Sequence, residues 1–316
     1  MDRETYLKNV KPTSAGWIKY SGNPVMGGDL GTCFDISMME QDGRYRMWFS
    51  WRPKKSLAYT ESTDGIHWDA PVIVLSPRET SEGWEQDLNR PAVVLCEGVY
   101  HMWYTGQLPG KLPRAVDGRS WLFYATSIDG LNWQRASLKP VLSAEEPWEK
   151  VALMSPHVIW DDKERLFKMW YSGGEQYEPN AIGYATSRDG LHWDKYPANP
   201  IFTADPSHQW EQHKVAACQI YQKNDWFLMF YIGYFDEDTA QIGIARSRDG
   251  ITGWERHPQN PIIAPSVGEW DGEACYKPFA LFDGAMWRLW YNGRNGTLEQ
   301  IGLATHEGED LGFPEQ

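Results

Sequence analysis

The feature that most constrains this chain is an internal repeat centred on an aromatic-rich phrase. The phrase reads YRMWFS at 45–50, YHMWYT at 100–105, FKMWYS at 167–172, FLMFYI at 227–232 and WRLWYN at 287–292. Its third residues are Met47, Met102, Met169, Met229 and Leu289, so the steps are 55, 67, 60 and 60 residues. Self-similarity at a nearly fixed spacing is the signature of a repeat architecture. The sequence therefore predicts five copies of one structural unit.

Each copy carries the same succession of strand signals. An apolar run precedes the phrase, and a third strand such as FYATS (123–127) or GYATS (183–187) follows it. Four of the third strands run into Ser-x-Asp-Gly and a Trp, and Asp-Gly between strands is a strong hairpin signal. A fourth strand follows that Trp, and four antiparallel strands make one propeller blade. We therefore predict an all-β, five-bladed β-propeller with four antiparallel strands per blade, forming a single domain over residues 1–316.

The fifth copy lacks its last part. After GLATH (302–306) the chain contains neither Asp-Gly nor a closing Trp, whereas WIKYSGNP at 17–24 resembles a fourth strand. We expect this N-terminal strand to close the last blade and so to remove an open sheet edge. The inner strands are then expected at 33–40, 90–96, 156–161, 216–222 and 276–282.

The Ser-x-Asp-Gly-x-x-Trp hairpins resemble the Asp-boxes of sialidases, and we interpret them as turn and packing elements. Their aspartates are therefore not catalytic candidates: Asp64, Asp129, Asp189 and Asp249. A Trp followed by an acid recurs at Trp84-Glu85, Trp148-Glu149, Trp210-Glu211 and Trp270-Asp271. We interpret these acids as structural too, because a site for one substrate needs asymmetry between the blades.

Composition excludes several classes of partner. The net charge of −13 argues against binding a nucleic-acid backbone or an anionic membrane, and no apolar run approaches the roughly 18 residues of a membrane span. The four cysteines have no metal-ligand spacing, so we expect buried thiols, no metal and no cofactor. The N-terminus MDRETYLKNVKP has no signal-peptide pattern. It favours a cytoplasmic protein, although a removed leader would leave the same trace, and the oligomeric state stays open.

The residues that differ between blades are the candidates for a site. In a propeller, the loops entering the first strand and those joining the second and third strands share one face, where a pocket is expected. Asp35 begins the first inner strand, where the other copies have Arg90, Ser155, Ala217 and Lys277. The predicted catalytic residues are Asp35, Asp87, Glu273 and Glu175. The predicted substrate-binding residues are Arg52, Arg90, His157, His213, Lys214, Lys277 and Arg294.

Five blades, an aspartate on the first inner strand and the repeated MWY strands together resemble the five-bladed glycoside hydrolases of families 43, 32, 62, 68, 117 and 130. In the family 43 pattern, the aspartate of an Asp-Pro dipeptide on the first blade is the base. Asp35 matches this aspartate, with Ile36 in place of Pro. Ala92 and Met154 stand where that pattern has its other two carboxylates. The resemblance implies an enzyme acting on a carbohydrate.

Glycosidic cleavage needs one acid to protonate the leaving oxygen and one carboxylate to activate water or attack carbon. Our hypothesis assigns Asp35 as base or nucleophile, Glu273 or Glu175 as acid, and Asp87 as the residue that orients or tunes the acid. The substrate would be a short oligosaccharide or a terminal glycosyl unit.

Two alternatives stay open. Arg90, His157, Lys214 and Lys277 come from four blades, and a ring of these cations could hold a phosphate or a sugar carboxylate. Family 130 includes phosphorolytic enzymes that need a single protein acid, so a glycoside phosphorylase or an enzyme for anionic sugars is the first alternative. A non-catalytic carbohydrate-binding propeller is the second.

Overall fold

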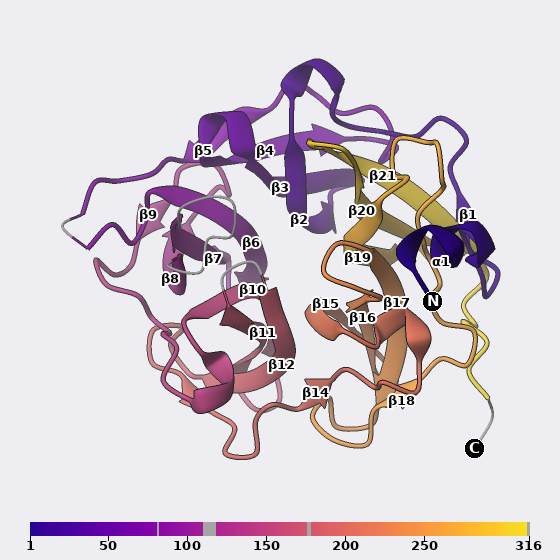
Figure 1. Ribbon diagram of the computed structural model, residues 1–316. Helices are drawn as coiled ribbons and strands as arrows, with labels where there is room; N and C mark the ends of the chain where they lie inside the picture. Colours follow the sequence, from indigo (N-terminus) through magenta and orange to yellow (C-terminus); the bar gives the residue numbers. More distant parts are fainter. Residues whose placement is uncertain (81, 110–117, 176–177, 315–316) are drawn as a thin grey trace. The chain divides into compact units, whose positions relative to one another are not determined.

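The protein is all-β apart from one short α-helix and four 3₁₀ turns among the residues that the structure describes (Figure 1). This computed structural model describes residues 1–80, 82–109, 118–175 and 178–314. The chain divides into two compact units, which we call the middle unit (Asp35–Thr203) and the terminal unit (Met1–Phe34 with Ala204–Gln316). Each unit is described by itself, and a single domain over the whole chain stays a prediction.

The middle unit contains three groups of antiparallel strands, and the second and third groups are joined into one nine-stranded sheet by a parallel pair between Ala152 and Ser120. Each group is called a sheet below. The first group consists of β2 (Cys33–Gln41), which begins two residues before the unit boundary, β3 (Arg44–Trp51), β4 (Ser56–Ser62) and β5 (Val72–Leu75). The second consists of β6 (Asp87–Cys96), β7 (Val99–Leu108), β8 (Arg119–Ser127) and β9 (Gln134–Arg135). The third consists of β10 (Ala152–Asp161), β11 (Leu166–Glu175), β12 (Glu178–Ser187), β13 (Asp194–Lys195) and β14 (Phe202–Thr203).

The terminal unit contains two four-stranded antiparallel sheets among its described residues. One consists of β15 (Lys214–Lys223), β16 (Trp226–Tyr234), β17 (Ala240–Ser247) and β18 (Glu255–Arg256). The other consists of β19 (Ala274–Phe282), β20 (Met286–Asn295), β21 (Leu298–Glu307) and the N-terminal β1 (Ile18–Lys19). The MWY-like phrases therefore form the second strand of every sheet, as the repeat predicted.

The N-terminal strand completes the last sheet, and this prediction is confirmed. Ile18 pairs with Thr305 and Lys19 pairs with Ala304, so β1 takes the place of the missing fourth strand. Trp17 is buried in the core of the terminal unit, where it packs edge-on against Phe230. The edge of β21 is thus covered by a segment almost 300 residues away in sequence, which removes an unpaired row of backbone groups.

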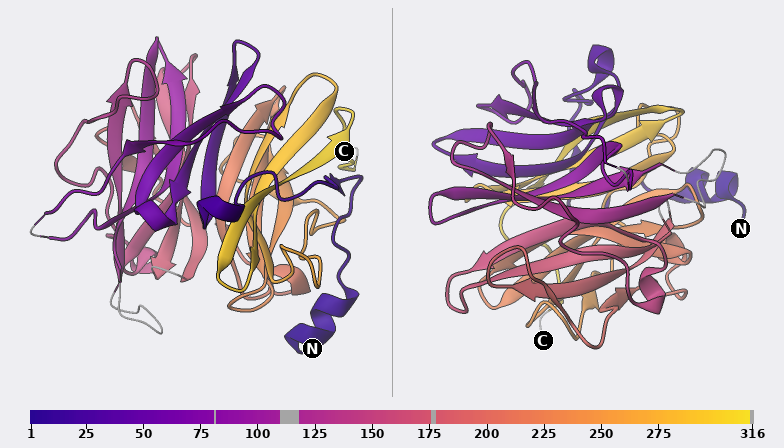
Figure 2. Two further views of the ribbon diagram at one scale, coloured as in Figure 1. Left: turned by 90° about the horizontal axis from the view of Figure 1, so that it is seen from above. Right: turned by 90° about the vertical axis from the view of Figure 1, so that its left-hand side faces the viewer.

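The helix α1 (Arg3–Asn9) is also held on the terminal unit (Figures 1 and 2). Tyr6 is buried, stacks on Phe235 with ring centroids 4.0 Å apart, and donates its hydroxyl to Gln241 Oε1 at 2.9 Å. These contacts place the helix beside the turn between β16 and β17. Among the described residues, no helix has the length and apolar character needed to cross a bilayer.

Four of the inner strands begin two to four residues earlier than the sequence predicted. The predicted starts at 90, 156, 216 and 276 lie inside or beside a β-bulge, and backbone pairing resumes on the N-terminal side of it. In the second sheet, for example, Arg90 and Pro91 together oppose the single residue Tyr104. A proline inside a strand is tolerated at such a bulge because it has no N–H to donate to the ladder. The correction therefore concerns where each strand begins, not whether it exists.

The four Asp-box hairpins are turn elements, as interpreted from the sequence. In the second one, the Ser127 hydroxyl accepts the Gly130 N–H at 3.0 Å, and Asp129 Oδ1 accepts the N–H groups of Leu131 and Asn132 at 2.9 and 2.7 Å. Hydrogen bonds from Asn132 hold the pKa of Asp129 well below its usual range. In the middle unit, Trp48 Nε1 on β3 also donates to the Gly130 carbonyl at 2.9 Å, which ties one sheet to the next.

A fully buried acid follows each Trp of the Trp-acid pairs, and a tyrosine from the second strand of its sheet donates to it. The pairs are Tyr104 with Glu85 (2.7 Å), Tyr171 with Glu149 (2.8 Å), Tyr231 with Glu211 (2.7 Å) and Tyr291 with Asp271 (2.9 Å). A cation from the fourth strand completes each group. The ion pairs are Arg135 with Glu85 (2.9 Å), Lys195 with Glu149 (2.7 Å), Arg256 with Glu211 (2.5 Å) and Lys19 with Asp271 (2.7 Å). We call each group a buried-acid clamp.

The first sheet lacks the clamp as a whole. It has Phe49 at the tyrosine position and Ala70 at the cation position, and Asp29 in its entry loop is exposed. A buried charge without its partner costs several kcal/mol, so keeping one part of a clamp without the others would be unfavourable. The clamps also explain why the Trp-acid pairs recur, which agrees with their interpretation as structural.

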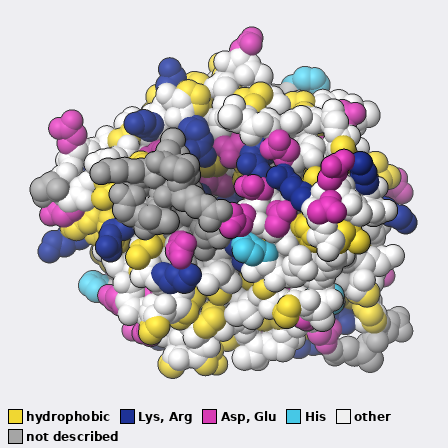
Figure 3. All heavy atoms as spheres, in the orientation of Figure 1, with side chains coloured by type: hydrophobic (Ala, Val, Ile, Leu, Met, Phe, Trp, Pro, Cys, Tyr) yellow, Lys and Arg dark blue, Asp and Glu magenta, His cyan; other side chains and the backbone are white. Residues whose placement is uncertain are grey.

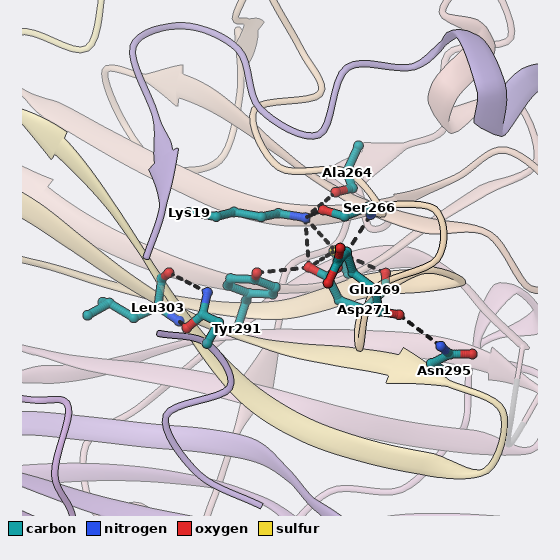
Figure 4. A network of polar contacts seen from close by, with 10 residues as sticks. Lys19, Ala264, Ser266, Glu269, Asp271, Tyr291, Asn295 and Leu303 are labelled. Carbon is teal, nitrogen blue, oxygen red and sulfur yellow. Dashed lines mark hydrogen bonds and ion pairs between the residues drawn. The ribbon is translucent and has the colours of Figure 1, made fainter. Parts of the chain in front are cut away.

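The clamp of the last sheet joins the two ends of the chain (Figure 4). Lys19 Nζ on β1 lies 2.7 Å from Asp271 Oδ2 and donates to the Ala264 carbonyl at 2.6 Å and to Ser266 Oγ at 2.8 Å. Tyr291 on β20 donates to the same carboxylate oxygen. Trp17-Ile18-Lys19 thus repeats the Trp-x-cation spacing of Trp133-Gln134-Arg135 in the second sheet.

We predict that Lys19→Met lowers the free energy of unfolding by about 3–5 kcal/mol, because it leaves the Asp271 carboxylate buried without its cation. Lys8→Met is the matched control, since Lys8 forms an exposed ion pair with Glu4 on α1 and its loss should be nearly neutral. Urea unfolding of both variants measures the difference. Equal effects of the two substitutions would contradict the role of the clamp.

Candidate functional site

The candidate site includes one backbone position that recurs in all five inner strands. Asp35, Arg90, Ser155, Ala217 and Lys277 have φ angles of 53°, 57°, 51°, 34° and 50°. These are the five residues that the repeat pattern predicted to be equivalent, and each of them has a left-handed backbone conformation. L-residues adopt this conformation at a cost of roughly 1–2 kcal/mol. Because all five repeats have a non-glycine residue there, the surrounding structure must stabilise this conformation in each of them.

Side chains of the neighbouring sheet support this conformation in the middle unit. The Ser50 hydroxyl on β3 accepts the Arg90 N–H at 2.8 Å, and the Thr105 hydroxyl on β7 accepts the Ser155 N–H at 3.3 Å. Both hydroxyl residues are the sixth and last residue of the MWY phrase in their repeat. Sequence reasoning did not single them out, although a Ser or Thr at the same place in three of the five phrases was the available signal.

Asp35 and Arg90 form a buried ion pair in the middle unit. Arg90 Nε lies 3.4 Å from Asp35 Oδ2, and the Asp35 side chain is 5% exposed. The two side chains come from the first strands of adjacent sheets, each at the left-handed position. The guanidinium compensates for the burial of the carboxylate, so a charged Asp35 is tolerated there. Two of the predicted site residues are thereby brought together.

Asp87 lies on β6 three residues before Arg90 and is partly buried. Burial raises the pKa of its carboxyl group, and the positive charges of Arg52, Arg90 and Lys55 oppose that rise without cancelling it. The turn that carries Arg52 and Lys55 is held against β6, because the Leu88 N–H donates to the Lys55 carbonyl at 3.1 Å. The structure therefore gathers Asp87 and three cations in the middle unit.

His157 and Glu175 are the other predicted site residues of the middle unit. His157 is partly buried on β10 and follows the bulge at Ser155 and Pro156. Glu175 ends β11, with a side chain that is 46% exposed, and pairs with Lys150 at 3.1 Å. The structure therefore places this predicted acid in an exposed ion pair with a lysine.

Two predicted cations of the terminal unit are deeply buried. Lys214 at the start of β15 is 3% exposed, and its Nζ lies 4.6 Å from the centroid of the Tyr234 ring. Lys277 at the left-handed position of β19 is 5% exposed, and its charge acts on the Cys218 thiol. Burial nevertheless raises the pKa of that thiol to about 12, so it stays protonated at neutral pH.

The remaining predicted residues of the terminal unit lie nearer to solvent. Glu273 is 39% exposed and 4.0 Å from Arg294 Nε, and Arg294 also donates to the Asp238 carbonyl at 3.0 Å. His213 is exposed and donates its backbone N–H to the Tyr234 carbonyl at 3.0 Å. Arg90 and His157 belong to the middle unit and Lys214 and Lys277 to the terminal unit, so a ring of these four cations stays a prediction.

Charges of both signs are interspersed on the face seen in Figure 3, in contrast to a single basic surface. Among the described residues, no cluster of three or more His, Cys, Asp and Glu side chains is arranged to hold a metal ion. The chemistry offered by the middle unit is therefore that of carboxylates beside guanidinium and ammonium groups. Such a set suits proton transfer and anion binding.

Known structures share this architecture. A solved structure described as a glycoside hydrolase superposes with a TM-score of 0.73 at 21% identity, covering 99% of this chain and 97% of that one. At this identity the likeness establishes the fold alone. The model of glycosyl hydrolases family 43 matches residues 21–306, so this chain belongs to that family.

The relatives found by sequence match only part of this chain. An uncharacterized protein of Mycobacterium tuberculosis is 29% identical over 219 residues, which cover 65% of this chain and 67% of that protein. A 1,2-beta-oligomannan phosphorylase of Thermoanaerobacter sp. (strain X514) is 28% identical over 207 residues, covering 64% of this chain and 62% of the phosphorylase. The relatives of this chain thus include a protein named as a phosphorylase.

We predict that Ala217→Gly is less destabilising than Ala216→Gly by about 1 kcal/mol or more. Ala216 and Ala217 are both buried on β15, but only Ala217 has a positive φ. Glycine in a strand costs roughly 0.5–1 kcal/mol relative to alanine, whereas at a left-handed position it relieves strain. Thermal or urea unfolding of the two variants gives the comparison, and a larger loss at position 217 would contradict a left-handed backbone there.

Proposed function

We propose that this protein is a glycoside hydrolase that cleaves a short oligosaccharide or a terminal glycosyl unit. In this proposal the five sheets are the blades of one propeller, and the active site lies at the edge where the inner strands begin. The family membership, the five equivalent left-handed positions and the carboxylates found beside them support it. A fold alone hosts many functions, so the argument rests on the residues of the site.

The observation that carries the proposal is the pairing of two differently placed carboxyl groups around Arg90. Asp35 is buried against the Arg90 guanidinium, whereas burial raises the pKa of Asp87. Two carboxyl groups with environments that push their protonation apart are the signature of an acid and a base. We therefore assign Asp35 as base or nucleophile and Asp87 as the general acid.

This assignment changes the role that the sequence suggested for Asp87. Glu273 and Glu175, the earlier acid candidates, both lie in solvent-exposed ion pairs. Asp87 has a buried carboxyl oxygen, Oδ1, and lies three residues before Arg90 on the same strand. Protonation of the leaving oxygen by Asp87, with water activated or carbon attacked by Asp35, satisfies the requirement for two carboxyl groups in glycoside cleavage.

A second candidate function is phosphorolysis. Arg52, Lys55 and Arg90 all act on Asp87, and such a group of cations would suit a phosphate nucleophile next to a single acid. The phosphorylase relative favours the same possibility. Release of free sugar from an aryl glycoside or a mannooligosaccharide, measured with and without added orthophosphate, separates the two reactions. Turnover that requires phosphate and yields a sugar 1-phosphate would replace hydrolysis with phosphorolysis.

We predict that Asp35→Asn lowers kcat by at least about 100-fold at a temperature where the variant is folded, although loss of the charge that pairs with Arg90 also lowers the unfolding midpoint. The carboxylate supplies general-base or nucleophilic catalysis, which contributes roughly 10²–10⁴-fold, and the amide keeps its shape. Asp69→Asn, at an exposed residue paired with Arg44, is the matched control and should retain full turnover. Full activity of Asp35→Asn would refute the assigned role.

We also predict that kcat/KM falls as the pH rises through the pKa of Asp87. The acid must carry its proton to act, and its pKa lies above the ordinary aspartate value of about 3.9. Asp87→Asn should remove this limb of the pH profile together with most of the activity toward poor leaving groups. The profile is measured with aryl glycosides whose leaving groups differ in acidity. An unchanged alkaline limb in Asp87→Asn would show that another group is the acid.

A further inference from the structure

Three polar side chains form a single row across the second sheet of the middle unit. Asp87 on β6 lies directly opposite Gln107 on β7, and Gln107 lies directly opposite Ser120 on β8. Directly opposite residues of antiparallel strands project from the same face with their Cβ atoms about 5 Å apart. Gln107 and Ser120 therefore lie on the same face of the sheet as the predicted acid Asp87.

Within the part of the chain that the structure describes, each member of this row has a buried polar atom without a hydrogen-bond partner. These atoms are Asp87 Oδ1, Gln107 Nε2 and Ser120 Oγ, and Arg90 Nη1 nearby is a fourth. Each such atom costs roughly 1–3 kcal/mol. Buried polar atoms are rarely left without partners, and a concentration of them in one row of one sheet points to an outside group that satisfies them.

The orientation of the Gln107 amide is fixed from its other end. Asn89 Nδ2 donates to Gln107 Oε1, and both side chains are almost fully buried, at 2% and 3% exposed. The carbonyl oxygen of Gln107 is thereby occupied, and its NH₂ group is the end left to donate. Sequence reasoning named neither Asn89 nor Gln107.

The row offers a donor, an acceptor and a hydroxyl that serves as both. The Gln107 amide donates, Asp87 Oδ1 accepts or donates according to its protonation, and the Ser120 hydroxyl does either. A sugar hydroxyl has the matching chemistry, because its oxygen accepts one hydrogen bond while its O–H donates another. An isolated cation or an apolar group would leave at least one of these atoms unsatisfied.

We propose that Gln107 and Ser120 bind a ring hydroxyl of the glycosyl unit cleaved at Asp87, and that Gln107 is a specificity-determining residue. This inference rests on the proposed function. A site built to hydrogen-bond a hydroxyl rejects the analogue that lacks it, since its own polar groups are then left unpaired. Asn89 acts on the substrate through Gln107 and is a positioning residue.

The test compares nitrophenyl glycosides with their monodeoxy analogues. Dissociation constants are measured by calorimetry in an Asp35→Asn background, where the glycoside stays intact, and turnover is measured separately with the otherwise unchanged chain. We expect one deoxy analogue to bind roughly 5–150-fold more weakly than its parent, the range that corresponds to one buried hydrogen bond. In Gln107→Met that difference should vanish, because the parent loses its partner as well.

Two further variants keep the test decisive. Gln134→Met, at an exposed residue of β9 in the same sheet, is the matched control and should keep the full discrimination. Ser120→Ala is a smaller change and should reduce the same discrimination if Gln107→Met does not fold. Discrimination that persists in both site variants would overturn the inference, and so would a change confined to thermal stability, which would indicate a bound water only. Hydroxyl-dependent binding without turnover would instead contradict the proposed hydrolase activity.

Discussion

Most of this fold depends on the hydrogen bond and the ion pair that stabilise a fully buried carboxylate. In four of the five sheets, an acid in the entry loop is held by a tyrosine from the second strand and a cation from the fourth. The clamp joins the entry loop to the second and fourth strands of the sheet, which are not neighbours in the sheet. Because removing one member would leave a buried charge or donor unpaired, the three members are present together, and the first sheet does without its tyrosine and its cation.

The candidate site depends on a second feature that all five repeats share, but at this one the side chains differ from repeat to repeat. Every inner strand has one left-handed residue, and in the sheets where the register is defined it lies at a bulge. The backbone there is the same in all five repeats, but the side chains are Asp35, Arg90, Ser155, Ala217 and Lys277. A repeated backbone thus presents five different side chains at one structural position.

Local sequence signals predicted the elements well. The MWY phrases and the Asp-Gly hairpins each depend on neighbours within one sheet, so their pattern is visible in the chain. The same reasoning placed β1 in the last sheet, which the pairing of Ile18 with Thr305 confirms. The starts of four inner strands were predicted too late, because pairing continues on the N-terminal side of a bulge, which in the second sheet contains Pro91.

The amino-acid sequence by itself determined the repeat, the all-β class, the strand that closes the last sheet and the five equivalent positions. These follow from short-range periodicity and from turn chemistry, which neighbouring residues alone specify. Only the tertiary structure decided that Arg90 pairs with Asp35, that burial raises the pKa of Asp87 and that Glu175 and Glu273 are exposed. Burial and charge pairing are properties of side chains from different sheets, and no spacing along one strand encodes them.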